Sequence, residues 1–179
     1  MGGRAGGGAG GGMGSGSRTL SRNLAARESA IRDNDFETLY ALDANGNELF
    51  KKIGDSHSVF YGDKGYLTKD AIVTHNHPSG SSFSHQDVAG MVYYNQKEMR
   101  ATGKEYTFSI KRPEKGWGVS WKTATGAFKR ASANARKAYK QQKTGNAASD
   151  RKLWISLTHQ YNEKAAKRLG WDYSVKKNK

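Results

Sequence analysis

The segment 70–100 constrains the fold most, because it contains the clearest strand, turn and helix signals in the chain. It begins with DAIVT, a short apolar run typical of a buried strand. HNHPSG follows, in which proline and glycine interrupt regular structure and predict a turn. Ser84 has Asp87 three positions later, and this spacing predicts the capped start of a helix over residues 84–100. A strand, a tight turn and a capped helix in this order indicate a fold that contains both helices and strands.

Other strand signals lie on both sides of this segment. The runs ETLYAL and ELF flank an Asn-Gly pair, Asn45 and Gly46, and this pattern predicts a hairpin. We expect further strands at residues 59–61, 105–111 and 116–121. The resulting fold class is α/β (α+β), with a mixed, largely antiparallel sheet flanked by helices.

Composition divides the chain into four segments. Residues 1–19 are rich in glycine, cannot bury apolar surface, and are expected to form a flexible tail or linker. Residues 20–33 have apolar positions at near-helical spacing and predict a short helix. Residues 34–124 are expected to form the sheet domain. Residues 125–179 are expected to add a basic extension of two helices.

The positive charge is concentrated at one end of the chain. Residues 111–179 hold 18 Lys and Arg against 4 Asp and Glu, whereas residues 1–110 hold 12 of each kind. Such segregation is typical of a segment attracted to polyanions, most commonly nucleic acid. The extension at 125–179 is therefore a candidate for DNA contact, through Lys129, Arg130, Arg136, Lys137 and Lys140. The alternative is a solvated helix face with no partner.

Several classes of protein are excluded by composition. The chain has no cysteine, so it contains no disulfide, no thiolate nucleophile and no cysteine-bound metal centre. Any metal must be bound by His, Asp or Glu. No run approaches the roughly 20 apolar residues of a membrane helix, and glycine stands where a signal peptide would have its apolar core. We therefore expect a soluble protein made in a cytosol, without membrane contact.

The turn HNHPSG contains a candidate metal site. His75 and His77 are two residues apart, so at the end of a strand their side chains leave the same face. Asp87, in the first turn of the next helix, can supply a third ligand. Two imidazoles and one carboxylate leave the fourth position of zinc open for water, as in catalytic sites. A lone His-x-His is more often a surface feature, and Ser84 with Asp87 can be a helix cap alone, but their conjunction favours a site.

At this point the sequence resembles a known family. His-x-His-Pro followed by Ser-x-x-Asp is similar to the signature of the JAB/MPN (JAMM, RadC-like) metallohydrolases. The runs HNHPSGSSFS, TGKEYTFSIKRPEKGW and HQYNEKAAKRLGWDY are similar to the C-terminal domain of phage head morphogenesis (Mu-type minor head) proteins. The resemblance spans residues 36–173. It implies a JAB/cytidine-deaminase-like architecture and a zinc-dependent peptidase or isopeptidase of phage or prophage origin, in the host bacterial cytoplasm or the virion.

The resemblance also implies roles for individual residues. His75, His77 and Asp87 match the ligands of one Zn²⁺ per chain, and Ser84 matches the serine that stabilises the oxyanion. Glu37 matches the glutamate that acts as general base and proton shuttle, with Glu48 as the alternative. The interval from the motif's proline to its serine is one residue shorter than in the deubiquitinating members, a departure that affects peptidase efficiency more than metal binding.

Two other interpretations of the function remain open. The chain could be a non-catalytic virion protein that binds DNA or the phage portal, with a vestigial or structural metal site, or a secreted or injected toxin module. If the chain is a hydrolase, we expect a peptide or protein substrate as its partner, and phage head or portal proteins as further partners. The remaining histidines, His57, His85 and His159, are expected to lie outside the site. The four tryptophans are expected to pack mainly in the core.

Overall fold

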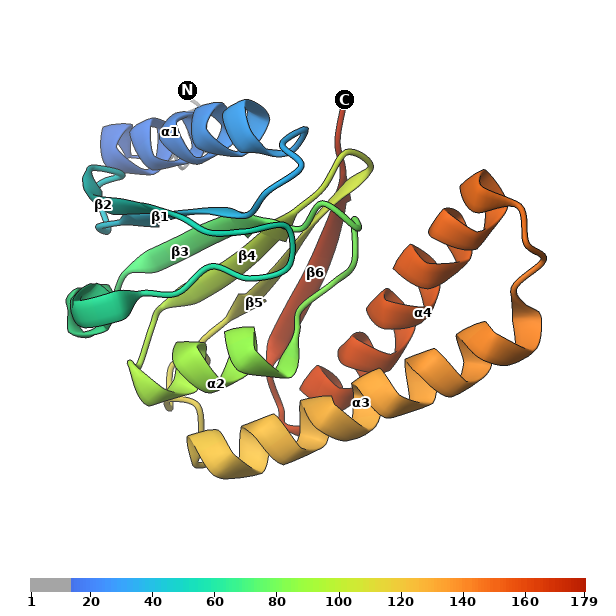
Figure 1. Ribbon diagram of the computed structural model, residues 1–179. Helices are drawn as coiled ribbons and strands as arrows, with labels where there is room; N and C mark the ends of the chain where they lie inside the picture. Colours follow the sequence, from blue (N-terminus) through green and yellow to red (C-terminus); the bar gives the residue numbers. More distant parts are fainter. Residues whose placement is uncertain (1–13) are drawn as a thin grey trace, which may run out of the picture.

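The computed structural model describes residues 14–179 as a six-stranded mixed sheet with helices on both faces (Figure 1). The strand order is β2-β1-β3-β4-β5-β6. Strands β3 and β4 run parallel, and the other neighbours are antiparallel, so the predicted α+β class with a largely antiparallel sheet is confirmed. The strands are β1 (Thr38–Leu42), β2 (Glu48–Ile53), β3 (Ile72–Asn76), β4 (Glu98–Thr102), β5 (Tyr106–Lys111) and β6 (Asp172–Lys177).

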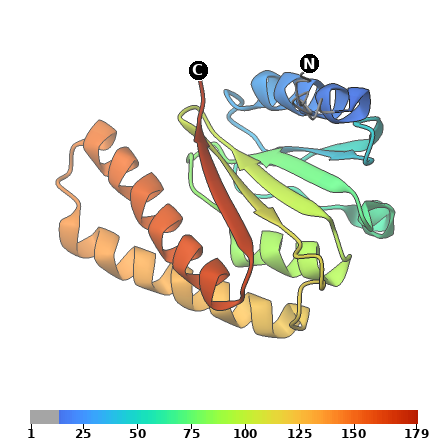
Figure 2. The same cartoon turned by 180° about the vertical axis from the view of Figure 1, so that it is seen from behind.

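Helix α1 (Ser15–Ile31) covers one face of the sheet, where its Leu24 packs against Leu42 and Ile72. The opposite face is covered by helices α2 (His85–Tyr93), α3 (Trp121–Gln142) and α4 (Ala147–Arg168), as Figure 2 shows from behind. A short 3-10 helix, η1 (Gly62–Thr68), precedes β3. Residues 1–13 of the predicted tail lie outside the described residues. Its end at residue 19 is wrong, because α1 already begins at Ser15.

The main core lies between the sheet and helices α2, α3 and α4. It contains Val73 and Phe108 from the sheet, Phe128 from α3 and Ala166 from α4. The predicted boundary between residues 124 and 125 therefore falls inside α3, and the two basic helices are part of the sheet domain rather than an extension of it. Their far ends pack on each other through Ala135, Ala138 and Leu157.

Local structure departs from the prediction at four places. The expected strand at 59–61 is irregular, and the one at 116–121 is a loop, because Gly116 and Gly118 adopt φ of +87° and +71°. The helix expected over 84–100 ends at Tyr93, and its last residues form β4. Strand β6 was not expected from the sequence.

Candidate metal centre

The end of β3 positions both candidate histidines. Neighbouring side chains on a strand alternate, so His75 faces the helices α2 to α4 while Thr74 faces α1. His77 follows the strand, and its backbone N–H donates to the Thr102 carbonyl (2.9 Å). Asn76 fixes the neighbouring chain, because its Oδ1 accepts from the Thr38 N–H (2.6 Å). This last bond brings the start of β1 beside the histidines.

Helix α2 positions the candidate carboxylate through its N-terminal cap. The Ser84 Oγ accepts from the Asp87 N–H (3.1 Å), and the Ser84 N–H donates to Asp87 Oδ2 (2.6 Å). This reciprocal pair is a capping box, which satisfies two helix donors that otherwise lack partners. The predicted cap is confirmed, and the cap also orients the Asp87 carboxylate toward the histidines.

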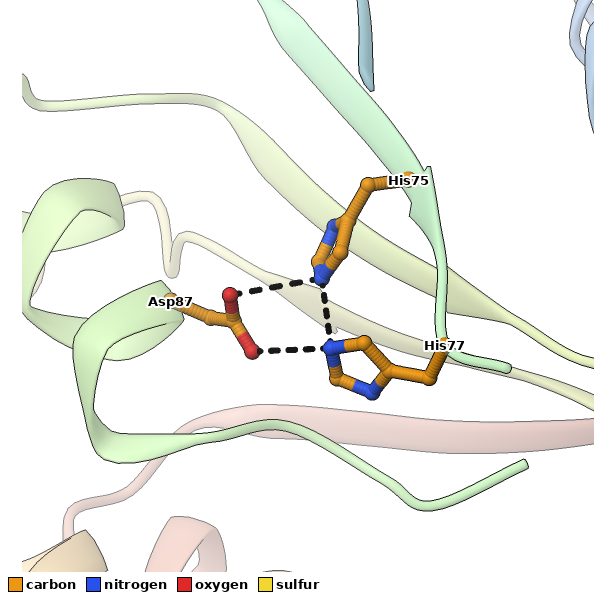
Figure 3. Close-up of side chains that lie close together, drawn as sticks. All are labelled: His75, His77 and Asp87. Carbon is orange, nitrogen blue, oxygen red and sulfur yellow. Dashed lines mark hydrogen bonds and ion pairs between the residues drawn. The ribbon is translucent and has the colours of Figure 1, made fainter. Parts of the chain in front are cut away.

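The three side chains converge on one point (Figure 3). The two Nε2 atoms of His75 and His77 are 3.0 Å apart. Asp87 Oδ1 lies 3.3 Å from the first Nε2, and Asp87 Oδ2 lies 3.4 Å from the second. Ligands of a tetrahedral zinc ion at about 2.0–2.1 Å stand about 3.3 Å from one another. The described residues therefore provide a cluster whose ligand spacing could hold one metal ion.

The hydrogen bonds of His77 indicate which atoms of the cluster can bind a cation. Its Nδ1 lies 2.9 Å from the Ser81 carbonyl, which can only accept, so Nδ1 carries the proton in the neutral ring. The lone pair on Nε2 then faces the other imidazole and the carboxylate of Asp87. Electron-rich atoms that converge in this way are stabilised by a cation between them. The donor set thus fits a metal ion on chemical grounds as well as on distance.

Protonation competes with metal binding at these ligands. Burial disfavours the charged forms, but the imidazoles of His75 and His77 outweigh it and hold the pKa of Asp87 well below its usual value. Burial likewise lowers the pKa of His77, but the hydrogen bond and charge of Asp87, with the charge of Glu37, raise it to about 9. A metal ion would therefore displace a proton from the cluster.

Glu37 lies beside the cluster, and the alternative Glu48 does not. The Glu37 side chain is only 7% exposed, and its Oε1 lies 3.9 Å from His77 Nε2. Burial raises the pKa of Glu37, despite the opposing charges of the two histidines. Glu48 lies on β2 in an exposed ion pair with Arg27. The structure thus brings Glu37, and not Glu48, to the cluster.

Two cavities that share lining residues adjoin the cluster. The inner cavity, of about 170 Å³, is lined by the three candidate ligands with Glu37 and Ser84. The outer groove, of about 510 Å³, shares Glu37, His77 and Ser84 and extends to Arg136 and Trp154 on the helical hairpin. The groove was not predicted, because nothing in the sequence indicated that α3 and α4 flank the turn that carries His77.

The remaining predicted residues lie in different places. His57, expected outside the site, lines both cavities from the loop before η1. His85 is partly buried and lines neither cavity, and His159 lies in a separate stack with Phe108 and Tyr173. The candidate DNA-binding residues Lys129, Arg130, Arg136, Lys137 and Lys140 are exposed along α3. Trp117 and Trp171 pack in the core as expected, whereas Trp121 is 40% exposed.

Comparison of the chain with protein-family models, with curated proteins and with solved structures gave no match. Within residues 14–179, no helix combines the length and the apolar character needed to cross a bilayer. The resemblance in the sequence thus remains a prediction.

Proposed function

We propose that the protein is a zinc-dependent metallohydrolase that cuts a peptide or isopeptide bond and binds one Zn²⁺ per chain. One observation carries the proposal. His75, His77 and Asp87 converge at tetrahedral spacing in a cavity whose wall also holds the buried Glu37. Three protein ligands with one open position are typical of catalytic rather than structural zinc sites. The motif's similarity to the JAB/MPN metallohydrolases, and to phage head proteins in particular, supports the same reading.

The ligand types favour zinc over the hard divalent cations. Magnesium and calcium prefer six or more oxygen ligands, whereas His75 and His77 supply nitrogen. Iron, manganese and nickel also accept two imidazoles and a carboxylate, but they commonly take more than four ligands. The spacing of 3.0–3.4 Å between ligand atoms fits a tetrahedral ion best.

In this proposal the chain's own residues move the protons and hold the developing charge. When bound, zinc supplies an acidified water and polarises the scissile carbonyl. Glu37 Oε1 accepts a proton from the attacking water and later delivers it to the leaving amine. The raised pKa of this buried carboxyl suits both transfers. Ser84 Oγ accepts from the Asp87 N–H and is left with its own O–H to donate to the oxyanion.

The first test is metal content, measured by mass spectrometry on the wild type, His77→Ala and Asp87→Ala. We expect about one zinc per chain in the wild type and none in either variant. Glu37→Gln then separates catalysis from binding, with peptide-library cleavage as the readout. It should keep its zinc and lose at least about a hundredfold in cleavage rate, because its amide cannot accept the proton. Glu48→Gln is the matched control and should keep both.

Three results would count against the proposal. A wild type without metal after zinc is added back would contradict it at the first step. A zinc-loaded protein whose cleavage is unchanged in Glu37→Gln would remove the proposed base. Loss of stability on removing a histidine, with no cleavage by the wild type, would favour the structural metal site of a virion protein that binds DNA or the portal.

A further inference from the structure

A second groove lies between helix α4 and the β5–β6 edge of the sheet. Figures 1 and 2 show α4 diverging from β6 toward its N-terminal end. The groove has a volume of about 750 Å³ and shares no lining residue with the two cavities at the metal centre. Any ligand bound there would therefore occupy a site separate from the proposed hydrolase site.

The wall of this groove is apolar and aromatic. Val175 on β6 is 43% exposed and pairs across the sheet with Phe108 on β5. Tyr106 is half-buried at the start of β5, two residues from Phe108 on the same face. The His159 ring is stacked on Tyr173 at 5.6 Å between ring centres and is tilted against Phe108 at 5.7 Å. Phe108 is only 1% exposed, so the rings and apolar surface that a ligand could reach here are those of Tyr106, His159 and Val175.

The surroundings of the His159 ring disfavour its positively charged form. Burial lowers its pKa, and its Nδ1 is held by the Tyr173 hydroxyl at 3.1 Å. An uncharged imidazole beside Tyr106 and Val175 keeps this wall suited to a planar, uncharged group.

The rim of the groove is positively charged. Lys104, Lys152 and Lys177 are exposed, and none of them has an ion-pair partner among residues 14–179. Glu105 is the acidic residue of the lining, and Arg151 neutralises it through bonds of 3.0 and 3.2 Å to its two oxygens. Three unpaired ammonium groups therefore surround an apolar, aromatic floor.

We propose that this groove binds single-stranded nucleic acid. The lysines would contact phosphates, and bases would lie against Tyr106 and Val175, the combination that non-specific single-strand binding uses. A simple anion needs no apolar floor, and an acidic peptide without aromatic residues offers no rings to it. A duplex keeps its bases stacked inside and would leave the floor uncovered. The site differs from the α3 face, where Lys129, Lys137 and Lys140 are exposed and line none of these cavities.

The test is binding of a fluorescein-labelled oligothymidylate to the full chain, followed by anisotropy at several salt concentrations. The triple variant Lys104→Ala/Lys152→Ala/Lys177→Ala should lose at least about tenfold in affinity. Its plot of log affinity against log salt should flatten by about 2, since each single-strand phosphate contact contributes about 0.7. The matched control is Lys129→Ala/Lys137→Ala/Lys140→Ala, which removes the same charge from α3 and should lose less than about threefold.

A further variant separates stacking from charge. Tyr106→Leu keeps apolar volume but removes the ring, so affinity should fall about fivefold or more with an unchanged salt slope. His77→Ala should bind the oligonucleotide as the wild type does, so failure of the metallohydrolase proposal would not affect this result.

Four outcomes would overturn the inference. They are no binding by the wild type at low salt, equal losses in the two triple variants, tighter binding of a duplex of the same length, and equal competition by a poly-glutamate peptide. Selective loss in the groove variant, together with the Tyr106→Leu effect, would support it.

Discussion

Two clusters of buried charge lie on opposite faces of strand β3, and they differ in how fully their polar atoms are paired. Thr74 faces α1, where its hydroxyl donates to Glu28 within a cluster that also contains Arg100 and Glu98. The next residue, His75, faces the other side and belongs to the candidate metal centre. One residue step along the strand thus separates the two environments.

In the α1-side cluster, each charged group has its partners. Arg100 donates to both oxygens of Glu28 and to Glu98 Oε1, which also accepts from the Ser109 hydroxyl at 2.7 Å. A buried network satisfied in this way is structural.

The metal-side cluster is less completely paired. The two Nε2 atoms and the carboxylate of Asp87 converge, His75 Nδ1 is buried without a hydrogen-bond partner among the described residues, and Glu37 comes no closer than 3.9 Å to His77. Both clusters are buried and charged, so burial alone does not identify a functional site. What distinguishes the candidate site is bonding capacity that the protein itself leaves unused.

The largest effect is expected from removing the cation of the α1-side cluster. Arg100→Met leaves Glu28 and Glu98 buried without their cation, and should lower the free energy of unfolding by about 3–5 kcal/mol. The measurement is urea unfolding of the metal-free protein. The control is Arg27→Met, also facing a glutamate but in an exposed pair, which should cost less than about 1 kcal/mol. Equal losses in the two variants would contradict the distinction between the clusters.

The second largest effect on stability is expected when zinc binds to the candidate metal centre. Zinc at a hundredfold excess over its dissociation constant should stabilise the wild type by about 2.7 kcal/mol. His77→Ala should show no such gain, because it removes one of three ligands. Thermal unfolding with and without zinc measures the difference, and His85→Ala, which leaves the ligands intact, should behave as the wild type does. Zinc stabilisation that survives in His77→Ala would place the metal elsewhere.

The sequence predicted the metal cluster because its ligands are close along the chain. His75 and His77 follow the strand directly, and Asp87 follows a recognisable cap, so local geometry alone brings them together. Glu37 was predicted from the family resemblance only. It is held beside His77 because Asn76 bonds to the start of β1, a contact between residues 38 positions apart.

The parts that sequence reasoning missed depend on distant partners. Strand β4 contains Glu98, Met99 and Arg100, which are good helix formers, and its extended form depends on pairing with β3 and on Glu28 of α1. Strand β6 is exposed and polar at the edge of the sheet, so the alternation of apolar and polar residues along its sequence is weak. The predicted domain boundary between residues 124 and 125 is wrong because residues such as Phe128 fill the core from within a basic helix.

The smallest effect on stability is expected from removing one hydroxyl on each side of β3. Ser84→Ala removes the cap of α2, and Thr74→Val removes a donor to Glu28, so each should cost about 1 kcal/mol of stability. The Ser84 N–H still holds Asp87 Oδ2 in the first variant, so zinc affinity should change only a few-fold. Cleavage should separate the two. Ser84→Ala should lose about tenfold to a hundredfold in rate, because Ser84 lines the cavity at the candidate metal centre, whereas Thr74→Val should cleave as the wild type does. Equal cleavage by both variants would restrict Ser84 to its role as a helix cap and leave Glu37 as the one proposed proton-transfer or oxyanion residue at the metal.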